Sequence, residues 1–271
     1  MPRTALVVLA LLFLAFAVGV LLARSGPTAG HPGTQPAAAT DEACGTAREE
    51  MVQRTLERRG VRDARVLAAM RKVPRERFMR APSCSEAYAD GPAPIGSGQT
   101  ISQPYIVAYM SEAVAPQPTD RCLEIGTGSG YQAAVLAELC AKVYSIEVVP
   151  DLGAFAEANL RAAGYGEEQV ALRVGDGYDG WPDAAPFDIV VITAAPPRVP
   201  RPLLEQLAVG GRLIAPVGPD GGYQELVLHR RTGGRPGTAD DSDFERQRLL
   251  GVRFVPFVGK VRERPEPPGG A

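Results

Sequence analysis

A glycine-rich turn and a distant acidic residue are the features of this sequence that point most directly to chemistry. Residues 123–130 read LEIGTGSG, as at the end of a strand that enters a helix. Glycines in such a turn let the backbone approach a ligand, and the N–H groups at the helix start face it. The next predicted strand ends in Glu147, about twenty residues on, where a carboxylate can accept both ribose hydroxyls of an adenosine cofactor. The candidate contacts in the turn are Glu124, Gly126, Gly128 and Gly130.

The spacing of the glycines separates two kinds of adenosine cofactor. NAD-binding turns favour G-x-G-x-x-G, whereas this chain has G-x-G-x-G, with Tyr131 in place of the third glycine and Glu124 just before the turn. This pattern resembles the Rossmann-like methyltransferases that use S-adenosyl-L-methionine, and it disfavours an NAD-dependent oxidoreductase. A tight turn that binds no ligand is the alternative.

The elements around the turn alternate between strand and helix from Asp120 onward. This alternation predicts an α/β fold in which βαβ units wind around a parallel sheet. The predicted strands are 121–125, 142–147, 170–174, 187–193 and 212–217, and the predicted helices are 131–140, 150–163 and 202–207. Two last strands, 223–230 and 249–258, are joined by a polar loop at 232–243 and should form an antiparallel edge.

Three helices are predicted before the sheet. Thr46 and Glu49 form a capping box for the first, and residues 63–70 form the second. Residues 88–99 are irregular, and the third helix begins at Pro104 with Ser102 near its N-cap.

The two ends of the chain differ from its body. Residues 5–23 are an uninterrupted apolar run long enough to cross a bilayer, and 15–17 (AFA) also fit a signal-peptidase site. Cleaved signal peptide and membrane anchor both stay open, and we expect the body outside the cytoplasm. The resulting division is 1–23 signal or anchor, 24–43 flexible linker, 44–264 folded domain and 265–271 disordered tail.

Composition excludes other classes of function. The chain has 29 basic and 31 acidic residues and a net charge of -2, so it lacks the basic field of a nucleic-acid-binding protein. Its four Cys and two His are too scattered for a metal site, and His31 and His229 receive no role. Cys122 and Cys140 are expected to be buried thiols, whereas Cys44 and Cys84 could pair in an oxidising compartment.

Several further segments narrow the resemblance. They are GVRDARVL at 60–67, VPRERF at 73–78, GQTISQP at 98–104, GDG at 175–177, TAAP at 193–196 and VRFVP at 252–256. In this order and spacing, from about Glu49 to Val258, the chain resembles the protein-L-isoaspartate O-methyltransferases. The N-terminal segment and the loop 232–243 depart from that pattern, and the family is usually cytoplasmic, which makes cytoplasm the alternative location.

The resemblance implies an activity and a set of roles. The enzyme would use S-adenosyl-L-methionine to esterify the free carboxylate of L-isoaspartyl residues in damaged proteins and peptides, which starts repair through a succinimide. Ser102 would be catalytic by binding the substrate carboxylate; the alternative is that it only caps the helix that starts at Pro104, and both roles can hold together. The other implied contacts are Gln99 and Thr100 beside Ser102, Glu147 for the ribose, Asp176 and Gly177 for the adenine, and Val255 and Phe257 for the peptide.

The expected reaction needs no general base, because a carboxylate is already ionised at neutral pH. Positioning of the acceptor should therefore dominate catalysis. Two alternatives stay open: a Rossmann-like methyltransferase with a different acceptor, or a membrane-anchored module that binds the cofactor without catalysis. We expect a monomer that has no metal, binds no nucleic acid, and contacts the membrane, if at all, through residues 5–23.

Overall fold

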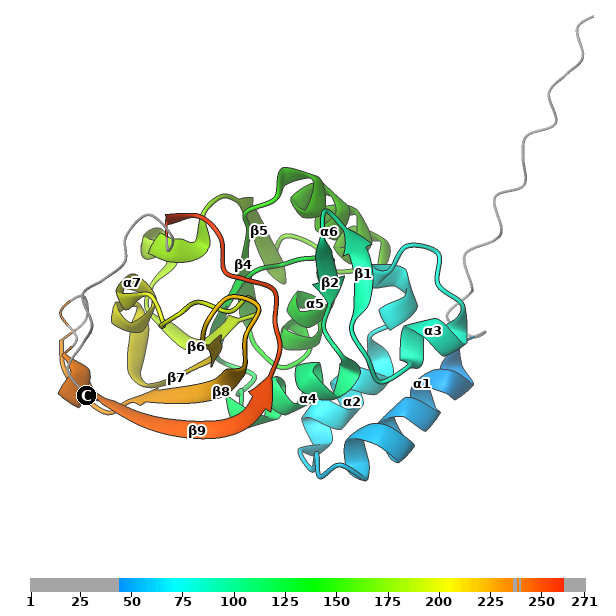
Figure 1. Cartoon of the computed structure of the whole chain (residues 1–271), viewed down its shortest axis with the longest axis horizontal. Helices are drawn as coiled ribbons and strands as arrows, with labels where there is room; N and C mark the ends of the chain where they lie inside the picture. The colour runs from blue at the N-terminus through cyan, green and yellow to red at the C-terminus, as the bar shows by residue number, and fades with distance from the viewer. Residues whose placement is uncertain (1–43, 236–237, 239, 261–271) are drawn as a thin grey trace, which may run out of the picture. The chain divides into compact units, whose positions relative to one another are not determined.

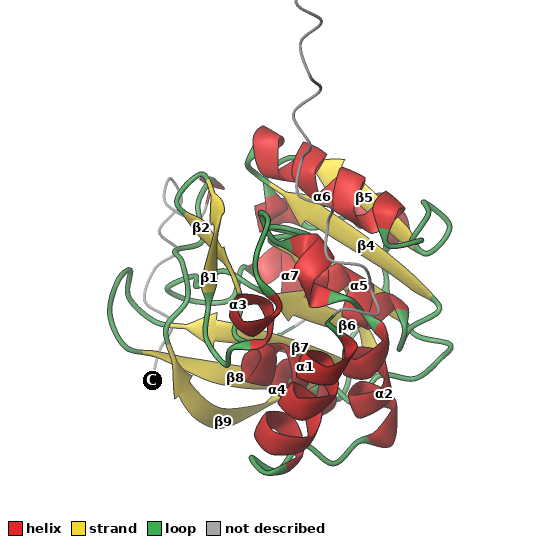
Figure 2. Cartoon of the chain, turned by 90° about the vertical axis from the view of Figure 1, so that its right-hand side faces the viewer, coloured by secondary structure: helices red, strands yellow, loops and turns green. Residues whose placement is uncertain are grey.

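A seven-stranded sheet organises the fold, and the computed structural model describes residues 44–235, 238 and 240–260. The strands lie in the order β5-β4-β3-β6-β7-β8-β9, seen from two sides in Figures 1 and 2. Their bounds are β3 Arg121–Ile125, β4 Lys142–Glu147, β5 Val170–Val174, β6 Phe187–Ile192, β7 Leu207–Val217, β8 Gln224–Arg231 and β9 Phe244–Val252. The first five strands in this order are parallel, and β8 and β9 add an antiparallel edge. The predicted α/β fold with an antiparallel C-terminal edge is thus confirmed.

Both faces of the central strands β3 and β6 are buried. On one face Cys122, Ile189 and Val191 belong to a core shared with α1, α2 and α4–α6. On the other face Val190 and Ile192 pack with α7 and two short 3-10 turns. Strands covered on both faces read as continuous apolar runs, which is why β6 was recognisable in the sequence. The bounds are α4 Pro104–Ala113, α5 Tyr131–Ala137, α6 Pro150–Ala162, α7 Arg201–Glu205, η3 Gly177–Asp179 and η4 Pro182–Ala184.

A helical extension precedes the sheet. It contains α1 Gly45–Met51, a π-helical continuation η1 Val52–Glu57, α2 Ala64–Lys72, η2 Arg75–Phe78 and α3 Cys84–Tyr88. The predicted second helix is confirmed, and the Asp63 side chain accepts hydrogen bonds from the N–H groups of Arg65 and Val66 at its start. The predicted capping box of Thr46 is wrong, because the N-cap of α1 is Cys44, two residues earlier, and Thr46 lies inside the helix.

Two further segments differ from prediction. The stretch 88–99 is not wholly irregular, because β1 Ala93–Gly96 pairs with β2 Gln99–Ile101 as a short hairpin. The predicted strand 249–258 is confirmed only for 249–252, because β9 runs from Phe244 to Val252 and residues 253–258 leave the sheet (Figure 1, red end of the ribbon). We call residues 253–258 the strap. The strap is held by hydrogen bonds in which Ala195 N–H donates to Val255 O and Phe257 N–H donates to Ala195 O, a pairing that replaces the ladder of β9.

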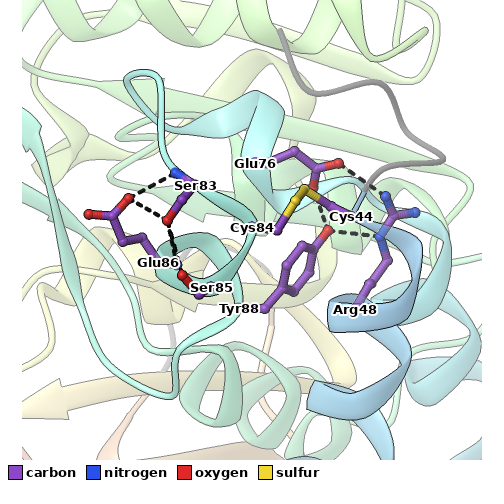
Figure 3. Close-up of a disulfide and its surroundings, with 8 residues drawn as sticks. All are labelled: Cys44, Arg48, Glu76, Ser83, Cys84, Ser85, Glu86 and Tyr88. Carbon is purple, nitrogen blue, oxygen red and sulfur yellow. Dashed lines mark hydrogen bonds and ion pairs between the residues drawn. A yellow bond between two sulfur atoms is a disulfide. The ribbon is translucent and has the colours of Figure 1, made fainter.

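All four cysteines form disulfides. Cys44 pairs with Cys84 at a Cα–Cα distance of 5.2 Å, as expected, and joins α1 to α3 (Figure 3). The prediction that Cys122 and Cys140 are thiols is wrong, because they pair at a Cα–Cα distance of 6.5 Å. Helix α5 ends at Ala137, and the turn that follows it brings Cys140 within reach of the start of β3.

The predicted signal or anchor at 5–23, the linker at 24–43 and the tail at 265–271 lie outside the described residues, as does His31. Within residues 44–260, apart from the gaps at 236–237 and 239, no helix has the length and apolar character needed to span a membrane.

The disulfides generate a prediction about stability. The Cys44–Cys84 disulfide joins residues 40 positions apart, and the Cys122–Cys140 disulfide joins residues 18 positions apart. Each therefore restricts the conformations of the unfolded chain. Removing either pair, as Cys44→Ser with Cys84→Ser or as Cys122→Ala with Cys140→Ala, should lower the free energy of unfolding by about 2 to 4 kcal/mol. Urea denaturation with circular dichroism measures this. An unchanged midpoint for both double variants, with an unchanged denaturant slope, would contradict it.

Candidate active site

The candidate site lies at the carboxyl ends of the central strands. The chain leaves β3 toward β4 on one side, while β6 pairs with β3 on the other, so strand order reverses at this point. Ligands of open α/β sheets bind in the crevice outside such a reversal. A cavity of about 810 Å³ occupies this position, and we call it the glycine-loop cavity. Its lining includes Gln99, Thr100, Ser102, Gly126, Gly128, Glu147, Gly177, Thr193, Val255 and Phe257.

The glycine turn has the backbone geometry that its sequence predicted. Gly126, Gly128 and Gly130 have φ values of +96°, +58° and +92°, which side-chain-bearing residues rarely adopt. A Cβ on Gly126 would collide with the Thr193 hydroxyl on the neighbouring strand end. Gly130 does not line the cavity; its Cα faces α6, where an added Cβ would lie 3.1 Å from Leu160 Cγ. The first two glycines therefore shape the cavity, and the third allows close helix packing.

Glu147 is fixed at the cavity wall. Its Oε2 accepts a hydrogen bond from Gly128 N–H at 2.7 Å, and its Oε1 accepts one from Val149 N–H at 2.9 Å. The residue is 4% exposed, so it is not a solvated strand end. A carboxylate has about four acceptor positions, and these two hydrogen bonds leave two of them free on a residue that lines the cavity. A pair of neighbouring hydroxyls fits this arrangement.

Glu124 lies beneath the turn rather than in the cavity. It is fully buried and accepts a hydrogen bond from the Ser145 hydroxyl, which is 2.6 Å from the Thr127 hydroxyl. Its Oε1 has no hydrogen-bond partner among the described residues. Burial raises the pKa of Glu124 to about 8; the hydrogen bond from Ser145 opposes this shift, and the charge of Glu147 adds to it. Glu124 therefore supports the turn from a buried position in which its neutral form is favoured.

Asp176 and Gly177 follow β5 but differ in their placement. Gly177 lines the cavity, whereas Asp176 is not among the lining residues. The Asp176 carboxylate accepts hydrogen bonds from Tyr178 N–H at 2.9 Å and from Lys260 N–H at 2.7 Å. Asp176 thus ties Lys260, two residues beyond the strap, to the turn that presents Gly177.

A second cavity adjoins the first, and we call it the outer cleft. It is lined by Arg59, Pro92, Thr100, Ser102, Gln103, Ile106, Thr193, Gly222, Tyr223 and residues 250–255. Thr100, Ser102, Thr193 and Val255 line both cavities. These four residues form the junction, where a molecule in one cavity can meet a molecule in the other.

Ser102 does not cap α4. The N-cap is Gln103, and the N–H of Tyr105 donates to Asp90 Oδ1 at 3.2 Å, so the capping prediction is wrong. Asp90 takes that role from a distant part of the chain, which sequence spacing could not reveal. The Ser102 hydroxyl has no hydrogen-bond partner within the described part of the chain and is available at the junction.

Sequence reasoning missed several lining residues. Thr193 directly follows β6, and its hydroxyl donates to the carbonyls of Ile125 and Gly126. Its place after a central parallel strand is a signal that could have identified it. Arg59 and Tyr223 carried no comparable signal, because they come from the first helical segment and from the β7–β8 connection.

Comparisons with known proteins agree with this geometry. The family described as protein-L-isoaspartate(D-aspartate) O-methyltransferase matches residues 46–262. A protein-L-isoaspartate O-methyltransferase of Gloeobacter violaceus is 53% identical over 216 residues, 80% of this chain and 99% of that protein. One of Opitutus terrae is 52% identical over 228 residues, 84% of this chain and 92% of that protein.

Solved structures show the same fold. A protein-L-isoaspartate O-methyltransferase superposes with a TM-score of 0.69 at 28% identity, covering 79% of this chain and 67% of that chain. A Plasmodium falciparum structure in complex with S-adenosyl-L-homocysteine has a TM-score of 0.66 at 23% identity, and it supports the fold alone. With a family match across most of its length, this chain belongs to the protein-L-isoaspartate(D-aspartate) O-methyltransferase family.

Proposed function

We propose that this chain transfers a methyl group from S-adenosyl-L-methionine to the free carboxylate of L-isoaspartyl residues in damaged proteins and peptides, and that Ser102 orients the acceptor. The resulting ester cyclises to a succinimide, which starts repair. The observation that supports this proposal most is the junction between the two cavities. A cofactor in one cavity and a peptide in the other can meet there without competing for space.

The glycine-loop cavity fits the cofactor. Glu147 offers two free acceptor positions to a ribose diol, and the positive φ values of Gly126 and Gly128 bring the backbone close to the ligand. Gly177 packs directly on Ile125, where a Cβ would collide, and it lines the cavity at the place we assign to the adenine. Gln99 and Thr100 also line this cavity.

Three predicted cofactor contacts act from outside the cavity in this proposal. Glu124 supports the turn through Ser145, and Gly130 permits α6 to pack closely. Asp176 orients the turn that carries Gly177, and its remaining acceptor positions serve the adenine amino group only if the turn shifts toward the ligand.

The junction suits in-line methyl transfer. When bound, S-adenosyl-L-methionine supplies an electrophilic methyl group. The acceptor carboxylate is already ionised, so the chain must orient it and exclude water rather than remove a proton. Among the described residues, neither cavity is lined by a His, Lys or Cys side chain, and the free Ser102 hydroxyl can donate to the acceptor. Val255 of the strap lines both cavities and offers an apolar contact toward the peptide, whereas Phe257, a predicted peptide contact, is 3% exposed and lines only the glycine-loop cavity.

The disulfides support an oxidising location for the enzyme. Structural disulfides persist in periplasmic or extracellular compartments and are rare in the cytosol of most organisms. Pairing of all four cysteines agrees with the export signal or anchor predicted at 5–23, a segment outside the described residues. Membrane attachment and a monomeric state stay predictions.

The first test addresses Ser102. Ser102→Ala should lower kcat/KM for an isoaspartyl peptide about 10- to 100-fold, because one hydrogen bond to a charged acceptor is lost. Binding of S-adenosyl-L-homocysteine, measured by calorimetry, should persist. Ser85→Ala, in α3 and outside both cavities, is the matched control. Equal activity of the two variants would contradict the role.

A second test addresses Glu147. Glu147→Gln should weaken binding of S-adenosyl-L-homocysteine about 10- to 100-fold, because the amide loses charge and one acceptor position at the ribose. Glu157→Gln, on the exposed face of α6, is the control. An unchanged Kd for Glu147→Gln would remove this residue from the cofactor site.

A third test addresses location. Alkaline phosphatase fused after Val258 of the full chain should be active in cells, because that reporter needs an oxidising compartment to form its disulfides. The same fusion without residues 1–43 should be inactive. The opposite result has two parts: neither fusion is active, and alkylation shows that the cysteines of the untagged chain are free thiols. Together these two findings would place the enzyme in the cytoplasm.

A further inference from the structure

We infer that the outer cleft prefers isoaspartyl peptides with an acidic side chain within about two residues of the isoaspartate, and that Arg253 binds that acidic group. This inference rests on the proposed function. It concerns the sequence around the isoaspartate, which decides how efficiently a damaged protein is repaired. The chemistry of methyl transfer does not set that preference.

The first observation is the charge of the cleft. Its lining contains two arginines, Arg59 and Arg253, and no acidic residue. The rest of the lining is polar without charge or apolar, with Leu250, Phe254 and the 69% exposed Tyr223 on the apolar side. A peptide in this cleft would therefore meet positive charge without a negative counterpart on the cleft wall.

The second observation is that the two arginines are not equivalent. Arg59 Nη1 lies 2.6 Å from Asp90 Oδ2, and its guanidinium stacks 3.5 Å from the centre of the Tyr105 ring. Arg253 is exposed and forms no hydrogen bond or ion pair with any other described residue. Arg59 is thus neutralised and held in place, and Arg253 is the cation left available to a ligand.

The third observation is the position of Arg253 on the strap. It stands two residues before Val255, which belongs to the junction and is anchored by the hydrogen bond from Ala195. Extended chain advances about 3.3 Å per residue, so the Cα atoms of Arg253 and Val255 lie about 7 Å apart. An extended peptide has the same pitch, so Arg253 reaches a side chain one or two residues from the one at the junction.

The isoaspartyl carboxylate itself is a poor partner for Arg253. Methyl transfer removes the charge of that carboxylate, so a guanidinium bound to it would stabilise the reactant more than the transition state. Arg253 serves better if it binds a second anion that stays charged throughout. An aspartate or glutamate near the damaged residue supplies one, with a Coulomb attraction that bulk solvent only partly screens.

The test compares peptides that differ at one position. Each carries one isoaspartate, an amidated C-terminus, and Glu, Gln or Lys one or two residues away on either side. The wild-type enzyme should show a kcat/KM about fivefold higher for the best Glu peptide than for its Gln partner, chiefly through KM. Raising the salt concentration to about 0.5 M should reduce that ratio toward one.

Variants assign the preference to a residue. The Glu-to-Gln ratio should fall to about one in Arg253→Gln and below one in Arg253→Glu. Arg248→Gln is the matched control, because Arg248 lies on β9, pairs with Glu225 at 3.4 Å and lines neither cavity. It should keep the wild-type ratio. Ratios within one variant cancel any general loss of active protein.

Three outcomes would overturn the inference. One is an equal kcat/KM for the Glu, Gln and Lys peptides in the wild-type enzyme. Another is an equal loss for all three peptides in Arg253→Gln, which would place Arg253 on the acceptor carboxylate. The third is methylation of no isoaspartyl peptide by a protein that binds S-adenosyl-L-homocysteine. That result would refute the proposed function as well, whereas the first two leave it intact.

Discussion

The contact between Glu147 and the glycine turn is the interaction on which the rest of the site depends. It joins the end of β4 to the turn that follows β3, through the hydrogen bond from Gly128 N–H. That contact exists because Gly126 and Gly128 adopt positive φ values and because Gly126 has no side chain to meet Thr193. The turn therefore contacts two neighbouring strand ends, that of β4 through Glu147 and that of β6 through Thr193. The cavity is the space that they leave.

The acceptor side of the site is positioned by the helical extension. Asp90 binds Arg59, the side chain of Gln103 and the N–H of Tyr105, so one carboxylate fixes the segment around Ser102. Behind it, the Cys44–Cys84 disulfide lies beside a buried network in which Arg48 contacts both Glu76 and Tyr88 (Figure 3). Burial and the hydrogen bond to Glu76 raise the pKa of the Tyr88 hydroxyl, so it keeps its proton and donates to that carboxylate. Asp90 thus links the helical extension to the segment around Ser102.

The strap connects these two halves. It crosses from β9 to the end of β6 and pairs with Ala195 there, and two residues beyond it Lys260 N–H donates to Asp176, which precedes the cavity-lining Gly177. Val255 consequently belongs to both cavities, while Phe257 is buried against the sheet. A single extended segment closes the site, and its first residue, Arg253, is exposed in the cleft where a peptide would enter.

The sequence by itself determined the central sheet and the cofactor half of the site. The limits of β3, β4 and β5 were predicted to the residue, because buried parallel strands are marked by apolar runs and by turns. The turn and Glu147 were predictable because both lie within one βαβ unit, where spacing along the chain fixes spacing in the fold. Only the tertiary structure decided that Asp90 rather than Ser102 satisfies the start of α4, that Cys122 pairs with Cys140, and that residues 253–258 leave the sheet. These features depend on contacts between distant segments, which local propensity and periodicity do not encode.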